Sequence, residues 1–217
     1  MQNDTLSEAI LVEHVSKVFK NKTVLEDINI KIPAGQIYGL SGPNGAGKSI
    51  MLRILCGLMK PTRGAVTILG KRLGIDTDFP PSTGALIDTP GFLPQYSGRR
   101  NLEMLAVIQN KISSSDIEAT MRLVGLDPED DLPVRAYSNG MRQRLGIAQA
   151  VMEHPQVLIL DEPTDAIDQA GWRDVYQHLL ELRESGTAIL LASNNLDEIR
   201  ILCDEAFILE KGKIRAA

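Results

Sequence analysis

Short apolar runs alternate with helix-like segments along most of this chain. Near-continuous apolar runs over Ile37–Leu40, Val157–Leu160 and Ala188–Ala192 predict strands buried on both faces of a parallel sheet. Between the last two runs, Gln169–Glu184 carries apolar side chains at the spacing of an amphipathic helix, namely Trp172, Val175, Leu179 and Leu182. Because strand, helix and strand follow one another in this order, the sequence predicts an α/β fold.

The middle of the chain has a different pattern. Between about residues 90 and 154 there is little strand signal, and three helical stretches are predicted: Asn101–Asn110, Asp116–Val124 and one beginning near Asn139. We therefore expect a single domain made of two parts. Residues 1–89 and 155–217 would form an α/β core, and residues 90–154 would form an inserted α-helical subdomain. Another strand is predicted over Ile28–Ile32.

Composition excludes some classes of partner. The 217 residues are 43% hydrophobic, which is enough for a sizeable core, and the formal net charge of −5 gives no support to nucleic-acid binding. Cys56 and Cys203 lack the spacing of a metal site, so we expect reduced thiols in a cytoplasmic protein. With neither a signal-peptide pattern nor an apolar run of the length that a spanning helix needs, we expect any membrane role to come through a partner.

A glycine-rich segment follows the first of the predicted core strands. It reads GPNGAGKS, fits the pattern GxxxxGK[ST] and precedes a helix predicted over Ile50–Leu58. Its backbone N–H groups and the helix N-terminus would surround phosphate oxygens, the lysine would reach the β- and γ-phosphates, and the serine would bind Mg²⁺. The segment predicts an ATP site formed by Gly42, Pro43, Asn44, Gly45, Ala46, Gly47, Lys48 and Ser49.

Two acidic residues end another buried strand. Val157–Leu160 leads directly into Asp161 and Glu162, and ligand sites in open α/β sheets lie at such carboxyl ends. Asp161 would belong to the Mg²⁺ shell, and Glu162 would act as the general base on the attacking water. Taken alone, the pair also fits a simple turn at a strand end.

These motifs, in this order, resemble the nucleotide-binding domains of ABC transporters over nearly the whole chain. The resemblance implies a P-loop NTPase fold: a RecA-like core with an edge antiparallel β-subdomain, both formed by residues 1–89 and 155–217, and an inserted α-helical subdomain. Tyr137–Met141 reads YSNGM where the family commonly has LSGGQ, so Ser138 and Gly140 are retained. Variants of this kind are similar to those in exporters of the bacitracin-resistance and lantibiotic-immunity type.

The resemblance also implies a second ATPase domain. In the family the signature faces the nucleotide of the other subunit, so this chain would form a homodimer or a heterodimer. Asp168 stands at the position that shapes the dimer contact, although an acid at a helix N-terminus is the competing interpretation. Phe19 stands where the family has an aromatic side chain that stacks on adenine, and a core phenylalanine is the alternative.

Two positions depart from the family pattern. Where a glutamine usually touches Mg²⁺ and couples to the membrane domain, the alignment places Asp88; the nearest glutamine, Gln95, lies seven residues later. Where a switch histidine usually follows the strand after the acidic pair, the chain has Asn194. An asparagine amide can donate a hydrogen bond to a phosphate oxygen, but it cannot carry a proton or a charge.

The resemblance therefore implies an ATP-binding and ATP-hydrolysing subunit that energises a separate membrane-spanning subunit. Export of a drug, peptide or lipid-like substrate is the expected direction, and the chain would lie at the cytoplasmic face of the membrane through its partner. Two alternatives stay open. One is a weakly hydrolysing regulatory subunit, which Asp88 and Asn194 favour, and the other is an ABC ATPase that works without a membrane.

Overall fold

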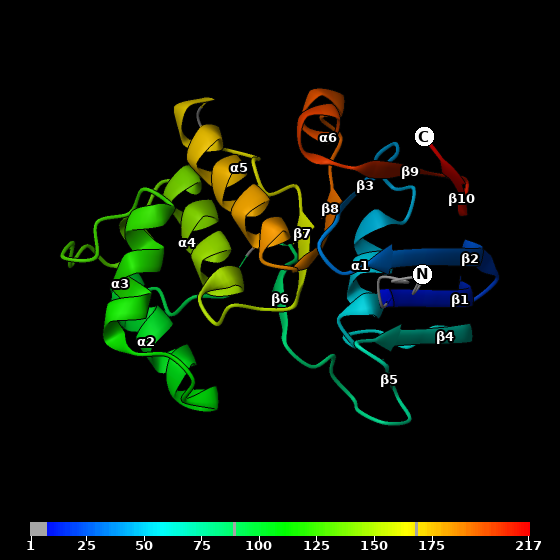
Figure 1. Cartoon of the computed structure of the whole chain (residues 1–217), viewed down its shortest axis with the longest axis horizontal. Helices are drawn as coiled ribbons and strands as arrows, with labels where there is room; N and C mark the ends of the chain where they lie inside the picture. Colours follow the sequence, from blue (N-terminus) through cyan, green and yellow to red (C-terminus); the bar gives the residue numbers. More distant parts are fainter. Residues whose placement is uncertain (1–7, 89, 168) are drawn as a thin grey trace, which may run out of the picture.

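The computed structural model describes residues 8–88, 90–167 and 169–217, and contains two sheets (Figure 1). The smaller sheet is antiparallel, with strand order β2-β1-β4-β5. The larger sheet has the order β10-β9-β3-β8-β7-β6. The strands of the smaller sheet are β1 (Glu8–Phe19), β2 (Lys22–Pro33), β4 (Arg63–Ile68) and β5 (Lys71–Arg72). Those of the larger sheet are β3 (Ile37–Ser41), β6 (Thr83–Leu86), β7 (Val157–Asp161), β8 (Ala188–Ala192), β9 (Glu205–Glu210) and β10 (Lys213–Ala216).

The three buried strands predicted from apolar runs are the centre of the larger sheet. β3 pairs in parallel with β8 and β9, and β8 pairs in parallel with β7. The strand predicted over Ile28–Ile32 lies within β2 of the other sheet, so two segments that are neighbours in sequence belong to different sheets. Gly35, at a φ of 70°, lies in the turn that separates them.

The five predicted helices are present with shifted ends, and a sixth helix, over Leu196–Leu202, was not predicted. The first helix ends at Leu55 rather than Leu58, and Gly57 follows it with a φ of 71°. The helix predicted over Asn101–Asn110 begins at Gly98, three residues earlier than predicted. The Ser97 side chain accepts a hydrogen bond from the Arg100 N–H and caps this helix. None of the helices in the described ranges has the length and apolar content that a membrane span requires. The helices are α1 (Lys48–Leu55), α2 (Gly98–Gln109), α3 (Ser114–Leu123), α4 (Asn139–Val151), α5 (Gln169–Glu184) and α6 (Leu196–Leu202).

The larger sheet separates two hydrophobic cores. Along β7, Leu158 and Leu160 pack with helices α2 to α5, whereas Val157 and Ile159 pack with α1 and the antiparallel sheet. This alternation follows from the two-residue period of a strand. α1 therefore lies between the two sheets (Figure 1). Because both faces of β7 are covered, its carboxyl end is held firmly where it delivers the two acidic residues.

Helices α2, α3 and α4 come between β6 and β7 in the chain and lie together away from the antiparallel sheet (Figure 1). The architecture is that of a P-loop NTPase, as the sequence predicted. The exact division at residues 89–90 and 154–155 stays a prediction.

Candidate functional site

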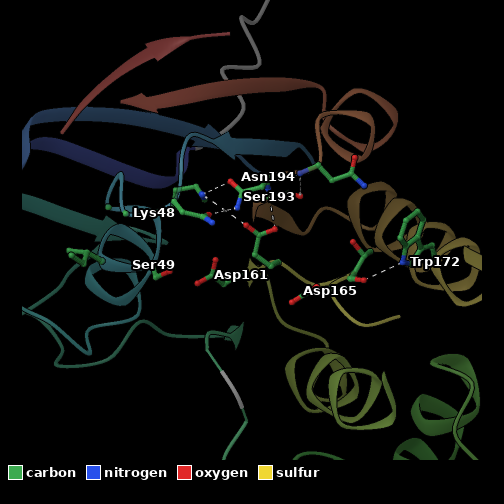
Figure 2. Close-up of a pocket in the computed structure, with 14 residues that line it drawn as sticks. Lys48, Ser49, Asp161, Asp165, Trp172, Ser193 and Asn194 are labelled. Atoms are coloured by element: carbon green, nitrogen blue, oxygen red, sulfur yellow. Dashed lines mark hydrogen bonds and ion pairs between the residues drawn. The ribbon is translucent and has the colours of Figure 1, made fainter. Parts of the chain in front are cut away.

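A cavity of about 790 Å³ opens at the carboxyl ends of β3, β7 and β8 (Figure 2). It brings together the glycine-rich loop, the acidic pair and the segment that follows β8. The lining residues are Asn44, Gly45, Gly47, Lys48, Ser49, Ile50, Asp161, Glu162, Thr164, Asp165, Trp172, Ser193, Asn194 and Asn195.

The glycine-rich loop joins β3 to α1 and requires its glycines. Gly42, Gly45 and Gly47 have φ angles of 149°, 79° and 112°, in the region that side chains disfavour. A Cβ at Gly42 would also lie 2.1 Å from the Leu209 carbonyl oxygen. The loop therefore turns tightly into α1, whose N-terminus lies at the cavity and carries a partial positive charge.

Lys48 is buried at the first position of α1, with 7% of its surface exposed. Its Nζ donates hydrogen bonds of 2.7 Å to the Gly42 carbonyl oxygen and to Asn194 Oδ1, and lies 4.0 Å from Glu162 Oε1. A buried ammonium needs such acceptors. An anion that enters the cavity would have to be a stronger hydrogen-bond acceptor for Lys48 than the Asn194 amide oxygen and the Gly42 carbonyl oxygen.

Asp161 and Ser49 form an oxygen-rich wall of the cavity. Burial raises the pKa of the Asp161 carboxyl, and a hydrogen bond with the Ser49 side chain opposes that shift. A hydroxyl and a carboxylate are ligands that suit Mg²⁺. Among the described residues no group of three His, Cys, Asp or Glu side chains could hold a metal ion. Mg²⁺ would therefore bind here only with further oxygens from water or phosphate, as it commonly does.

Glu162 follows β7 with a φ of 44°, in the left-handed region. Its N–H donates to the Ala192 carbonyl oxygen at 2.8 Å, and its Oε2 accepts from the Asn194 N–H at 3.1 Å. From α4, Gln143 Nε2 donates to the Glu162 carbonyl oxygen at 2.9 Å. These contacts hold the backbone on both sides and aim the carboxylate into the cavity.

Asn194 uses its amide on two sides of the cavity. Its Oδ1 accepts from Lys48, and its Nδ2 donates to Asn44 Oδ1 at 2.8 Å (Figure 2). Asn194 thus bridges the segment after β8 to the glycine-rich loop. A phosphate bound by Lys48 would replace the hydrogen bond from Lys48 to Asn194 Oδ1. Its oxygens would then lie beside the Asn194 side-chain amide.

Asp88 is held by an arginine. Arg53 donates to both carboxylate oxygens of Asp88, at distances from 2.7 to 3.1 Å. The negative charge of Asp88 also contributes to the raised pKa of Asp161, so the two carboxylates are neighbours. Asp88 is exposed and is not among the described residues that line the cavity.

A family model described as "ABC transporter" matches residues 25–165, which include the glycine-rich loop, Ser138, Gly140 and the acidic pair. The chain belongs to the ABC transporter family. It is an ATP-binding subunit of that family, as its sequence predicted.

Relatives agree with this assignment. An ABC transporter ATP-binding protein of Bacillus subtilis (strain 168), YdbJ, is 42% identical over 97% of this chain and 70% of its own length. The bacitracin transport ATP-binding protein BcrA of Enterococcus faecalis is 38% identical over 94% of this chain and 67% of its own length, which confirms the resemblance to the bacitracin type. The dimeric structure of the ABC transporter cassette MJ0796 is 23% identical, has a TM-score of 0.86 and covers 95% of this chain and 98% of its own, and so shows the fold.

The signature residues of this ABC domain lie outside the cavity. Ser138 Oγ accepts from the Met141 N–H at 3.1 Å and caps α4, as the sequence predicted. A Cβ at Gly140 would lie 2.7 Å from the Ala166 carbonyl oxygen, so the glycine permits close packing of α4 against the segment after the acidic pair. Neither residue is among those of the described chain that line the cavity.

The other predicted positions have mixed settings. Phe19 ends β1 with 41% of its surface exposed and has Lys17 Nζ 5.0 Å from its ring centroid, so it is not a core residue. Gln95 is exposed, and Asp168 lies outside the described residues. The predicted roles of Phe19, Asp88 and Asp168 stay predictions.

Sequence analysis did not single out Arg53 and Gln143 as contributors to this ABC site, and it assigned Trp172 only to the apolar face of a helix. Arg53 stands four residues after Ser49, which places both on one face of a helix, and this spacing was a usable signal. Gln143 and Trp172 could be placed only by tertiary structure. The Trp172 Nε1 donates to the Thr164 carbonyl oxygen at 3.2 Å across the cavity wall (Figure 2).

Proposed function

We propose that this chain binds ATP with Mg²⁺ in the cavity and hydrolyses it as the motor of a transporter. One observation carries the proposal: a buried ammonium, a helix N-terminus and two carboxylates converge on the same cavity, from Lys48, α1, Asp161 and Glu162. The first two attract phosphate, and the carboxylates suit Mg²⁺ and an attacking water.

Lys48 and the glycine-rich loop would bind the phosphates. A triphosphate would replace Asn194 Oδ1 as an acceptor for Lys48, because a charged oxygen makes a stronger hydrogen bond than a neutral amide oxygen. The N-terminus of α1 adds its partial positive charge on the same side. Phe19 is 41% exposed and would stack on the base with the ring face that Lys17 does not cover.

Ser49 and Asp161 would hold Mg²⁺, with Asp88 as a proposed additional ligand. When bound, the ion neutralises charge on the phosphate oxygens and on the leaving group. Asp88 would first have to leave Arg53, which now occupies both its oxygens. Arg53 and Mg²⁺ would therefore compete for the same carboxylate.

Glu162 would accept the proton of the attacking water. Asn194 would orient both that water and the Glu162 carboxylate. The Asn194 N–H already holds one oxygen of the Glu162 carboxylate. Its side-chain amide could donate to the γ-phosphate, but without the charge of a protonated histidine. We therefore propose slow but measurable hydrolysis by this subunit.

Asn194→His should raise the rate of ATP hydrolysis. One positioned donor to developing charge contributes about 10²–10³ in rate, of which asparagine would recover only a part. The measurement is steady-state phosphate release, with Asn194→Ala as the matched control that removes the donor and should lower the rate. An unchanged or lower rate for Asn194→His would show that the site is adapted to asparagine.

A second ATPase domain would complete the site. Ser138 and Gly140 lie outside this chain's own cavity, and the amino end of α4 that they form could face the nucleotide of another subunit. Asp168 would contribute to that contact. The dimeric arrangement of the MJ0796 cassette supports this mode of assembly.

A separate membrane-spanning subunit would dock near Asp88 and the segment Phe92–Asn101, which would place this chain at the cytoplasmic face of the membrane. In that segment Leu93 and Tyr96 are 45% and 42% exposed, as apolar groups that a partner could cover. The likeness to BcrA, described as a bacitracin transport ATP-binding protein, supports transport of a drug, peptide or lipid-like substrate, and export is the direction that we propose.

Co-purification tests the membrane partner. The tagged chain should retain a polytopic membrane protein in mild detergent, and Leu93→Asp combined with Tyr96→Asp should abolish retention. Val107→Asp is the matched control, because Val107 is 74% exposed near the other end of α2. Retention that survives the double substitution would move the docking site elsewhere, and a chain that retains no membrane protein would contradict the transport proposal.

The regulatory alternative has a specific observation in its favour. Asn194 Oδ1 accepts a hydrogen bond from Lys48, and Arg53 pairs with Asp88, so ligands at Lys48 and Asp88 would compete with internal contacts. A subunit that binds ATP but shows no turnover, even with its membrane partner, would fit this alternative and contradict the motor.

A further inference from the structure

Helix α6 carries an acid that the proposed reaction does not use. Glu198 is only 1% exposed, and each of its carboxylate oxygens has a hydroxyl partner. Ser193 Oγ donates to Oε2 at 2.5 Å, and Thr164 Oγ1 donates to Oε1 at 3.0 Å. The Tyr176 side chain, from α5, also acts to lower the pKa of the Glu198 carboxyl. Because a buried carboxylate is costly unless it is hydrogen-bonded, a carboxylate so fully satisfied has a defined geometry.

The two hydroxyls come from different walls of the nucleotide cavity. Ser193 follows β8, and Thr164 lies two residues after Glu162, in the segment that leads from β7 to α5. Both residues line the cavity, and both are almost fully buried. Glu198 therefore joins two segments that touch the nucleotide space but share no strand pairing at these residues.

A short chain of contacts leads from Glu198 to the reacting groups. Ser193 is followed by Asn194, whose N–H holds Glu162 and whose side chain holds Lys48. The Asn195 N–H donates back to Ser193 Oγ at 3.0 Å, and Asn195 Oδ1 accepts from the Glu198 N–H at 3.3 Å. The segment 193–195 is thus tied to α6 at both ends and leaves Asn194 little freedom.

We propose that Glu198 is a positioning residue for ATP hydrolysis, which fixes the segment 193–195 relative to the segment 162–167. The inference rests on the proposed function, since it concerns how Glu162 and Asn194 are held toward the γ-phosphate. Lys48 and the glycine-rich loop do not contact Glu198 in any described hydrogen bond, so ATP binding should depend on it little.

Hydrogen-bond geometry, rather than charge, is the expected requirement at this position. Burial raises the pKa of the Glu198 carboxyl, and the hydrogen bonds from Ser193 and Thr164 act against that shift. In Glu198→Gln the amide oxygen can accept from one hydroxyl while the amide nitrogen donates to the other. Glu198→Ala offers neither and leaves two buried hydroxyls without their acceptor.

Trp172 gives a readout that does not depend on turnover. It is the only tryptophan of the chain, it lines the cavity, and its indole N–H is bonded to the Thr164 carbonyl oxygen (Figure 2). ATP binding should change its fluorescence through the segment 162–167. Glu198→Ala removes the link from Thr164 to the segment after β8, while Glu162 stays bonded to Asn194, so the ATP-induced change that passes through Thr164 to Trp172 should be lost.

The experiment compares the wild type with Glu198→Ala, Glu198→Gln and Asp197→Ala. Asp197 is the exposed neighbour on α6, with 82% of its side chain accessible, and serves as the matched control. Glu198→Ala should lower kcat at least about tenfold, since small displacements of reacting groups cost about 10² in rate, while the Kd for labelled ATP changes less than about threefold. Glu198→Gln should recover most of the rate and the Trp172 response, and Asp197→Ala should resemble the wild type.

Two results would overturn the proposal. In the first, Glu198→Ala keeps the wild-type kcat and Trp172 response. In the second, kcat, ATP affinity and melting temperature fall together and Glu198→Gln behaves like Glu198→Ala, which is the result of a purely structural role. If the wild type binds ATP without turnover, the motor proposal fails and the Trp172 response alone tests the role of Glu198. Loss of the response in Glu198→Ala would then support the link between the two segments. Retention of the response would overturn that link.

Discussion

Glu162→Gln should stop ATP turnover while ATP binding persists. Glutamine has nearly the shape of glutamate and can still accept the hydrogen bond from the Asn194 N–H, but it cannot take a proton from water. Loss of a positioned general base should lower the rate by about 10²–10⁴. The measurement is phosphate release under saturating Mg–ATP, together with binding of labelled ATP.

The same substitution should trap a dimer with ATP between two subunits. Glu162 approaches the place of the γ-phosphate, so neutralising it relieves repulsion as well as removing the base. Size-exclusion chromatography with ATP should show the dimer. Asp165→Asn is the matched control, because it neutralises another acid that lines the cavity without removing the proposed base. A Glu162→Gln variant that stays monomeric at high protein and ATP concentrations would argue for a heterodimeric partner.

Lys48→Ala should weaken ATP binding at least tenfold. The substitution removes a charge-assisted contact to phosphate that is worth about 1.5–3 kcal/mol, and about 1.4 kcal/mol already corresponds to a factor of ten. Lys48 is buried at the first position of α1. Among the described residues that line the cavity there is no second lysine that could replace it. Titration with labelled ATP measures the effect.

Lys71→Ala is the control for the Lys48 substitution. Lys71 is exposed in the antiparallel sheet, so its replacement removes the same charge from the surface and not from the cavity. Its ATP affinity should match that of the wild type. An unchanged affinity in Lys48→Ala, in a protein that still melts cooperatively, would refute the assignment of the glycine-rich loop as the phosphate site.

The sequence was sufficient for the three central strands of the larger sheet and for the proximity of their motifs, whereas β6, β9 and β10 were not predicted. The apolar runs that became β3, β7 and β8 are buried on both faces, and such runs can be recognised without tertiary information. Because the carboxyl ends of these parallel strands meet at one edge, Lys48 and Glu162 could be expected at one cavity. Helix ends were less accurate, as at Ser97, where a local cap decided the start of α2.

The contacts between side chains could not be read from the sequence. The bond from Lys48 to Asn194 joins residues 146 positions apart, and the pair of Arg53 with Asp88 depends on how β6 leads back toward α1. The sequence does not distinguish Glu198 from its exposed neighbour Asp197, and only the structure shows that Glu198 is buried. Sequence periodicity reports which face of an element is apolar, but not which polar partner a distant segment supplies.

Phosphate release from Mg–ATP by the purified wild-type chain, alone and with its membrane partner, tests the central claim most directly. The geometry of Lys48, Asp161, Glu162 and Asn194 predicts slow but measurable release by the wild type and none above background in Glu162→Gln. Absence of release from the wild type in both states, with ATP bound, would contradict the account of this subunit as a motor.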